Sequence, residues 1–184
     1  MNLPNKLTML RIFMIPLFLI CFLMSSIPNH YLWALLVFGL ASLTDMADGM
    51  IARKQGLVTD FGVLMDPLAD KLLVMAAMIC FIPAGIVHAV VVIVILAREF
   101  LVTSIRLVAA GKGIVIAADK LGKLKTISQM IWICLGLLWL GLEGWGGAAA
   151  LWYLYQFFTG LTVSLTVVSG FNYTVKNRSL FSVA

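Results

Sequence analysis

Long apolar stretches, separated by short polar or turn-forming segments, recur along the whole chain. They predict six helices, over residues 5–26, 31–53, 60–82, 85–110, 122–141 and 148–174. Turn signals separate several of them, including Pro28, Pro83 and the glycine-rich residues 141–147. About 20 apolar residues in an α-helix cross the hydrocarbon core of a bilayer. The pattern therefore predicts an all-α, polytopic membrane protein with six transmembrane helices, in a single domain over residues 1–184.

The composition agrees with a membrane location. Of the 184 residues, 62% are hydrophobic and 11% are charged, and the mean hydropathy is +1.07. Such values are typical of an integral membrane protein and exclude an ordinary soluble domain. The apolar run over residues 12–24 lacks a convincing cleavage site, so we expect it to be the first span of the mature protein. Cys21, Cys80 and Cys134 lie in separate apolar stretches, which argues against a disulfide framework or a metal cluster.

The placement of charge predicts an orientation. The chain has a net charge of +5, but no Lys or Arg lies in the loops near residues 25–31, 82–88 and 141–150. Basic residues lie instead at the opposite helix ends: Lys6, Arg11, Arg53, Lys54, Arg106, Lys112, Lys120, Lys123, Lys125, Lys176 and Arg178. By the positive-inside rule, both termini face the cytoplasm. No basic run resembles a nucleic-acid patch, so we expect no nucleic-acid partner.

Four aspartates form the most informative motif. Asp45, Asp48, Asp66 and Asp70 make up half of the eight acidic residues, and carboxylates near hydrocarbon are costly and usually functional. Spacings of three and four residues place each pair on one helix face. All-oxygen ligation suits Mg²⁺ or Mn²⁺, and two such ions would balance four carboxylates. Because Mg²⁺ usually keeps coordination positions for substrate phosphates, the expected ligand is a diphosphate at the cytoplasmic membrane surface.

Small and polar residues near these acids allow two interpretations each. Gly49, Ala52 and Gly62 leave a smooth surface that permits either close helix packing or the approach of a flat nucleotide group. Asn5 and Thr8, near the cytoplasmic rim, either hydrogen-bond a nucleotide or cap the first helix.

Further charges interrupt the apolar pattern after the aspartates. We expect Glu99 to form a structural ion pair or to serve the site, and Arg98 to bind an anion, with Arg106 two turns further along the same helix. Lys123 and Lys125 either anchor the topology or bind phosphate. Lys71 is interpreted as a counter-charge or an interfacial side chain.

The motif D-x2-D-G-x2-A-R-x8-G-x3-D-x3-D over residues 45–70 resembles the signature of the CDP-alcohol phosphotransferase family at all eight fixed positions. Softer matches resemble the bacterial branch of that family that makes phosphatidylglycerophosphate. They are the opening run over residues 3–11, the run over 66–71, the Ala97-Arg98-Glu99 triplet and the run over 122–126. The last third of the chain adds no specific match.

The resemblance implies a fold, a reaction and a site. Members of the family are membrane enzymes, typically with six transmembrane helices and commonly homodimeric. In this branch, at the bacterial inner (plasma) membrane, they transfer the phosphatidyl group of CDP-diacylglycerol to sn-glycerol 3-phosphate and release CMP. By the resemblance, the four aspartates hold two Mg²⁺ or Mn²⁺ ions and Asp70 is also the general base. The CDP site would comprise Asn5, Thr8, Gly49, Ala52, Arg53 and Gly62, and the acceptor phosphate would meet Arg98, Arg106, Lys123 and Lys125.

Several alternatives remain at this point. Phosphatidylglycerol, as in cardiolipin synthesis, or inositol phosphate could be the acceptor. A cation transporter would place acids near the bilayer centre, whereas here they lie at one end, beside Arg53 and Lys54. A prenyl-diphosphate enzyme would carry a D-D-x-x-D motif, which is missing from the sequence.

Overall fold

The structure, a computed structural model, describes the backbone of residues 3–55, 60–114, 116–117 and 119–178 and the side chains of 9–44, 71–114, 116–117 and 119–178. Within these ranges it is all-helical, with no strand. The six helices are α1 (Leu3–Leu23), α2 (His30–Gln55), α3 (Asp60–Phe81), α4 (Ala89–Gly111), α5 (Lys120–Gly141) and α6 (Ala148–Lys176). The prediction of six helices is confirmed, and their ends agree within a few residues.

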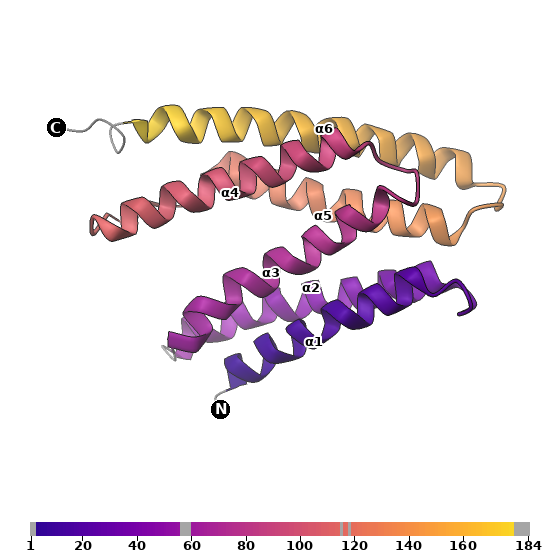
Figure 1. Cartoon of the computed structure of the whole chain (residues 1–184), viewed down its shortest axis with the longest axis horizontal. Coiled ribbons are helices and arrows are strands. Elements are labelled where there is room, and N and C mark those ends of the chain that lie inside the picture. The colour runs from indigo at the N-terminus through magenta and orange to yellow at the C-terminus, as the bar shows by residue number, and fades with distance from the viewer. Residues whose placement is uncertain (1–2, 56–59, 115, 118, 179–184) are drawn as a thin grey trace.

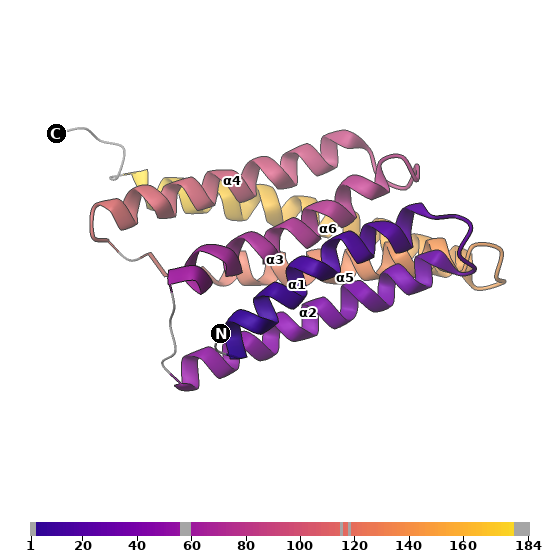
Figure 2. The same ribbon diagram turned by 60° about the horizontal axis from the view of Figure 1, so that its bottom comes forward.

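The helices alternate in direction along an elongated bundle (Figures 1 and 2). The short turns after α1, α3 and α5 lie at one end, whereas α2 ends, α3 begins and α6 ends at the other. α1 packs against α2 and α3, α5 packs against α6 and α2, and α4 packs against α6. α3 and α4 diverge from the turn that joins them toward the end where α2 stops (Figures 1 and 2).

Local capping explains where two of the helices begin. We expected the fourth helix to start at residue 85, but Gly85 has φ +74°, which is a left-handed conformation that ends regular helix. α4 instead starts after His88, whose ring accepts a hydrogen bond from the Val90 N–H at 3.3 Å. α5 starts after Asp119, whose carboxylate accepts one from the Lys120 N–H at 2.8 Å. These caps shift the starts by four and two residues from the expected positions.

An aromatic cluster joins the helices near the short turns. Phe81 of α3 meets Trp132 of α5 edge-on at 5.9 Å between ring centroids, and Trp132 stacks on Tyr155 of α6 at 6.0 Å. All three side chains are fully buried. A Cβ at Gly136 would lie 2.7 Å from the Phe81 ring and 2.9 Å from that of Tyr155, so this close crossing of helices requires glycine. The cluster therefore packs α3, α5 and α6 against one another.

Two helices of the described residues, α5 and α6, are long and apolar enough to cross a membrane. Only 17% of the apolar window of α6 is buried inside the molecule, and Phe157 and Phe171 are 63% and 73% exposed. A helix with an outward apolar face of this kind suits lipid better than water. The described parts of the first three helices contain shorter apolar segments, Met9–Leu23, His30–Thr44 and Lys71–Phe81, so six spans stay a prediction.

Candidate active site

The aspartate motif lies in the last part of one helix and the first part of the next. Asp45 and Asp48 belong to the last part of α2, and Asp66 and Asp70 to the first part of α3. Both segments lie at the same end of the bundle (Figure 1). From the spacing within each helix, we expect each pair to share one face. The side chains of the motif, Asp45, Asp48, Gly49, Ala52, Arg53, Gly62, Asp66 and Asp70, and those of Asn5 and Thr8 lie outside the described residues, so their roles stay predictions.

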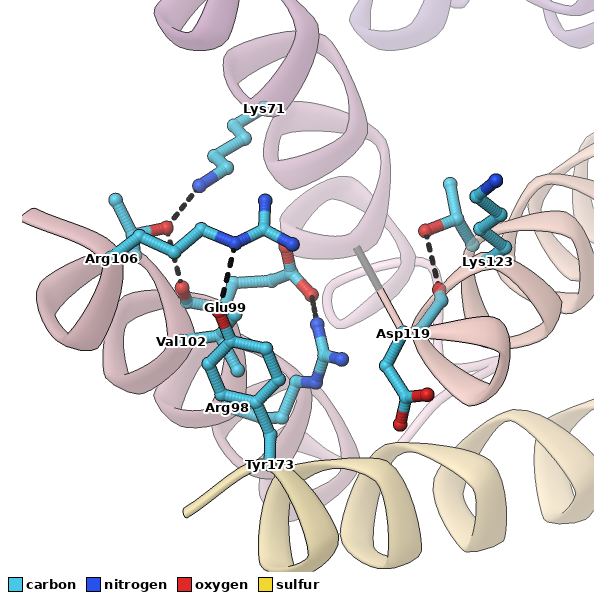
Figure 3. A pocket seen from close by; sticks show the side chains of 11 residues that line it. Lys71, Arg98, Glu99, Val102, Arg106, Asp119, Lys123 and Tyr173 are labelled. Atoms are coloured by element: carbon cyan, nitrogen blue, oxygen red, sulfur yellow. Dashed lines mark hydrogen bonds and ion pairs between the residues drawn. The ribbon is translucent and has the colours of Figure 1, made fainter. Parts of the chain in front are cut away.

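A polar cavity of about 210 Å³ opens between α3, α4, α5 and α6 at this end of the molecule. It is lined by Lys71, Arg98, Glu99, Val102, Thr103, Arg106, Asp119, Gly122, Lys123, Thr126 and Tyr173 (Figure 3). Pockets for drug-sized molecules usually measure roughly 300–1,000 Å³. The cavity therefore suits a small polar molecule rather than a whole lipid.

The described lining residues of this cavity carry an excess of positive charge. Four are basic and two, Glu99 and Asp119, are acidic, so their formal charges sum to +2. A phosphate monoester carries roughly −1.5 to −2 at neutral pH. Guanidinium groups match the oxygens of a phosphate with two parallel hydrogen bonds. The charge and the donor types together fit a phosphate-bearing ligand.

Arg106 is held by the last helix. Its Nε–H donates a hydrogen bond to the Tyr173 hydroxyl at 3.1 Å, and its guanidinium carbon lies 5.7 Å from the centroid of that ring. Tyr173 is only 3% exposed, so the surrounding side chains restrict the movement of its ring and hydroxyl. The bond engages Nε and directs the guanidinium to the cavity (Figure 3), where its terminal N–H groups can donate to an anion.

Arg98, two turns before Arg106 on α4, lies in a tightly packed position. Its Nη1 group contacts Glu99 Oε1 at 2.9 Å. A Cβ at Gly122 would come within 3.3 Å of Arg98 Nη2, and one at Gly170 within 3.0 Å of Arg98 Cγ. Two glycines on α5 and α6 therefore leave the space through which this arginine reaches the cavity.

Glu99 also pairs with Lys125 of α5, whose Nζ lies 2.6 Å from the same Oε1 atom. The expectation of a structural ion pair between Glu99 and a neighbouring helix is confirmed. Lys125 is 1% exposed, and it is not among the residues that line the cavity. Of the four basic residues expected around the acceptor phosphate, the structure brings Arg98, Arg106 and Lys123 together and places Lys125 behind Glu99.

Lys71 connects this cavity with the aspartate motif. Its ammonium group donates a hydrogen bond to the Thr103 hydroxyl of α4, and its side chain lines the cavity. Lys71 directly follows Asp70 on α3, and consecutive Cα atoms are about 3.8 Å apart. The wall of the basic cavity thus begins one residue after the last aspartate of the motif.

Four of the lining residues with polar side chains had no role in the sequence-based site: Tyr173, Thr103, Asp119 and Thr126. Thr126 closes the matched run over residues 122–126, which is a signal that could have identified it. Tyr173 contacts a residue 67 positions away, and no local pattern marks it. Asp119 caps α5 and also accepts a hydrogen bond from the Asn172 side-chain amide at 3.2 Å, which joins α5 to α6.

Comparisons with known proteins agree with the motif. The family model described as CDP-alcohol phosphatidyltransferase matches residues 1–168. A CDP-diacylglycerol–glycerol-3-phosphate 3-phosphatidyltransferase of Bacillus subtilis (strain 168) is 45% identical over 191 residues, which cover 96% of this chain and 95% of the relative. A protein of the same name from Rickettsia typhi is 41% identical over 180 residues, with 98% of this chain and 99% of the relative covered. The chain belongs to the CDP-alcohol phosphatidyltransferase family, as its aspartate motif predicts.

Proposed function

We propose that this protein transfers the phosphatidyl group of CDP-diacylglycerol to sn-glycerol 3-phosphate, giving phosphatidylglycerophosphate and CMP. One observation carries the proposal: a basic cavity sized for a small phosphate ester starts one residue after Asp70 of the family motif. The names of the two relatives support this acceptor, since both are glycerol-3-phosphate phosphatidyltransferases.

In the proposed reaction, Arg98, Arg106 and Lys123 hold the acceptor phosphate and thereby direct a free hydroxyl of the acceptor toward Asp70. Asp70 takes the proton of that hydroxyl as its oxygen forms a bond to the phosphatidyl phosphorus. The bond from this phosphorus to the oxygen of CMP breaks, and CMP leaves with the electron pair. Fixing the acceptor beside the base converts an encounter between two molecules into a reaction within one complex.

The donor set fits two divalent cations. Asp45, Asp48, Asp66 and Asp70 offer only carboxylate oxygens, which hard ions such as Mg²⁺ or Mn²⁺ prefer, and the family is generally dependent on divalent metals. When bound, the ions would neutralise the diphosphate and stabilise the departing CMP. Chelation of divalent metal should abolish CMP release and added Mg²⁺ or Mn²⁺ should restore it; full activity in excess chelator would contradict the assignment.

The donor nucleotide is assigned to the other residues of the motif. Gly49, Ala52 and Gly62 would let the CDP group approach the helix backbones, and Arg53 would pair with its phosphates. Asn5 and Thr8 of α1 would hydrogen-bond the nucleotide. The acyl chains can then stay in the bilayer, so the enzyme does not have to extract its lipid.

We further propose six spans in the bacterial inner (plasma) membrane, with both termini and the active site on the cytoplasmic side, and a homodimeric assembly. The Lys- and Arg-free turns at the opposite end of the bundle support this orientation. The exposed apolar faces of α4 and α6 support contact with lipid or with a second copy.

The test is a comparison of acceptors. Purified protein with CDP-diacylglycerol and Mg²⁺ is offered glycerol 3-phosphate, inositol phosphate, serine and phosphatidylglycerol in parallel, and CMP release is measured. We expect glycerol 3-phosphate to be used best. Preferential use of serine or phosphatidylglycerol would contradict the proposal, and preference for inositol phosphate would keep the phosphate pocket but change the product.

A further inference from the structure

A single carboxylate oxygen is shared by two cations at the edge of the basic cavity. Glu99 Oε1 lies 2.6 Å from Lys125 Nζ and 2.9 Å from Arg98 Nη1. Arg98 lines the cavity, whereas Lys125 does not. We propose that Lys125 is a positioning residue: it neutralises Glu99, so that Glu99 orients Arg98 toward the acceptor phosphate without neutralising it. This inference rests on the proposed function.

The position of Lys125 favours support over direct phosphate contact. Its side chain is 1% exposed, against 11% for Arg98 and 21% for Glu99. An ammonium group has three N–H donors, and two of the Lys125 donors go to Glu99 and to the Gln129 amide oxygen one turn along α5. The Gln129 amide nitrogen in turn contacts the sulfur of Met78 on α3 at 3.1 Å. A chain of side chains thus runs from α3 through α5 to the arginine on α4.

The charge balance explains why a buried lysine is needed at this position. Arg98 and Glu99 are adjacent on α4, and their long side chains bend toward each other to form the 2.9 Å ion pair. Without Lys125, the only cation paired with Glu99 among the described residues would be Arg98, and the full negative charge would compete with a phosphate for that guanidinium. With Lys125 present, the triad carries a net charge of +1, so the two members that line the cavity, Arg98 and Glu99, do not cancel the positive charge offered to a phosphate. The glycine at position 122 leaves room for Arg98 Nη2, so this end of the guanidinium can meet the ligand.

The proposal predicts an unusual pattern of rescue. Lys125→Gln should raise both the KM for glycerol 3-phosphate and its Kd, measured by titration calorimetry on the purified protein, by at least about tenfold, the effect of losing one charge-assisted hydrogen bond. The turnover number and the KM for CDP-diacylglycerol should change less than about twofold. In Glu99→Gln/Lys125→Gln, the unbalanced charge is gone and an amide oxygen can still accept from Arg98, so the KM and Kd for the acceptor should return to within about threefold of the unaltered protein.

Other variants keep the test decisive. Lys120→Gln, at an exposed lysine near the start of the same helix, is the matched control and should leave both constants unchanged. If Lys125→Gln does not fold, the double variant is compared with the unaltered protein alone, and its KM and Kd for the acceptor should still lie within about threefold of the unaltered values.

Three results would overturn the positioning role. One is a double variant that binds glycerol 3-phosphate no more tightly than Lys125→Gln, as expected if Lys125 touches the phosphate itself. Another is an unchanged acceptor affinity in Lys125→Gln. The last is a rise in the KM for CDP-diacylglycerol together with a fall in the turnover number and in the unfolding temperature. Calorimetry separates this test from the proposed function, because binding of glycerol 3-phosphate without its transfer would contradict only the reaction.

Discussion

The Nε–H of Arg106 donates a hydrogen bond to the hydroxyl of Tyr173, 3.1 Å away, although 67 positions separate the two residues in the chain. The bond joins α4 to α6 beside the basic cavity (Figure 3). It gives the last helix a role in the site, even though the last third of the sequence carries no family motif. The cavity proposed to bind the acceptor is therefore completed by Tyr173, a residue that is recognised only in the folded chain.

Tyr173→Phe should weaken acceptor binding with little effect on the donor. The substitution keeps the ring beside Arg106 but removes the oxygen that accepts from Nε. A typical net hydrogen bond contributes about 0.5–1.5 kcal/mol, so the KM for glycerol 3-phosphate should rise about 2- to 12-fold. Tyr153→Phe, at a tyrosine that is 75% exposed near the start of α6, serves as the control. A fall in turnover at unchanged acceptor KM would contradict the positioning of Arg106 by Tyr173.

Replacing the basic residues of the cavity should have a larger effect of the same kind. Arg98→Gln, Arg106→Gln or Lys123→Gln removes a charged donor, and hydrogen bonds to charged groups contribute about 1.5–3 kcal/mol. The KM for glycerol 3-phosphate should rise about 10- to 150-fold, while the KM for CDP-diacylglycerol stays nearly constant. Lys176→Gln, at an exposed lysine of α6, should change neither constant. Equal losses for donor and acceptor would place these cations at the diphosphate instead.

The sequence predicts the helices well because they depend on local pattern. Apolar runs of helix length bounded by turn residues identify all six helices. Asp45 and Asp48 belong to α2, and Asp66 and Asp70 to α3, in agreement with the predicted helix ranges. The start of α4 is missed because it depends on the left-handed turn at Gly85 and the cap at His88.

The composition of the cavity is harder to predict because it depends on how the helices rotate against one another. Lys123 and Lys125 are two positions apart and equally basic, yet one lines the cavity and the other is buried against Glu99. Residues two apart on a helix point to different sides, but the sequence does not say which side meets α4. The contribution of Tyr173 is missed for the same reason.

Conservative changes at the aspartates should separate the metal ligands from the base. Asp45→Asn or Asp66→Asn should weaken the binding of metal and of donor together. Asp70→Asn should retain measurable donor binding, because an amide still offers one oxygen, but it cannot take the proton of the acceptor. A general base typically contributes about 10²–10⁴-fold to the rate, so turnover should fall by this factor. Near-normal turnover of Asp70→Asn at saturating metal would assign the base to another residue.

The proposed orientation can be tested with single cysteines. After removal of Cys21, Cys80 and Cys134, Ser26→Cys and Glu143→Cys place thiols in the turns that lack basic residues. Both should react with an impermeant thiol reagent added outside intact cells. Ala117→Cys, in the segment between α4 and α5, should react only after the cells are opened. The reverse pattern would put the cavity on the wrong side for a cytoplasmic acceptor.

The central claim is that the cavity beside Asp70 accepts a phosphate ester whose phosphate stays in the product. The most direct measurement uses glycerol 3-phosphate labelled with ³²P, together with CDP-diacylglycerol, Mg²⁺ and the purified protein, and follows the label into the lipid fraction as CMP is released. We expect one label to enter the lipid for each CMP formed, and Arg106→Gln to need a much higher acceptor concentration for the same rate. Release of CMP with the label remaining in the aqueous phase would contradict the claim.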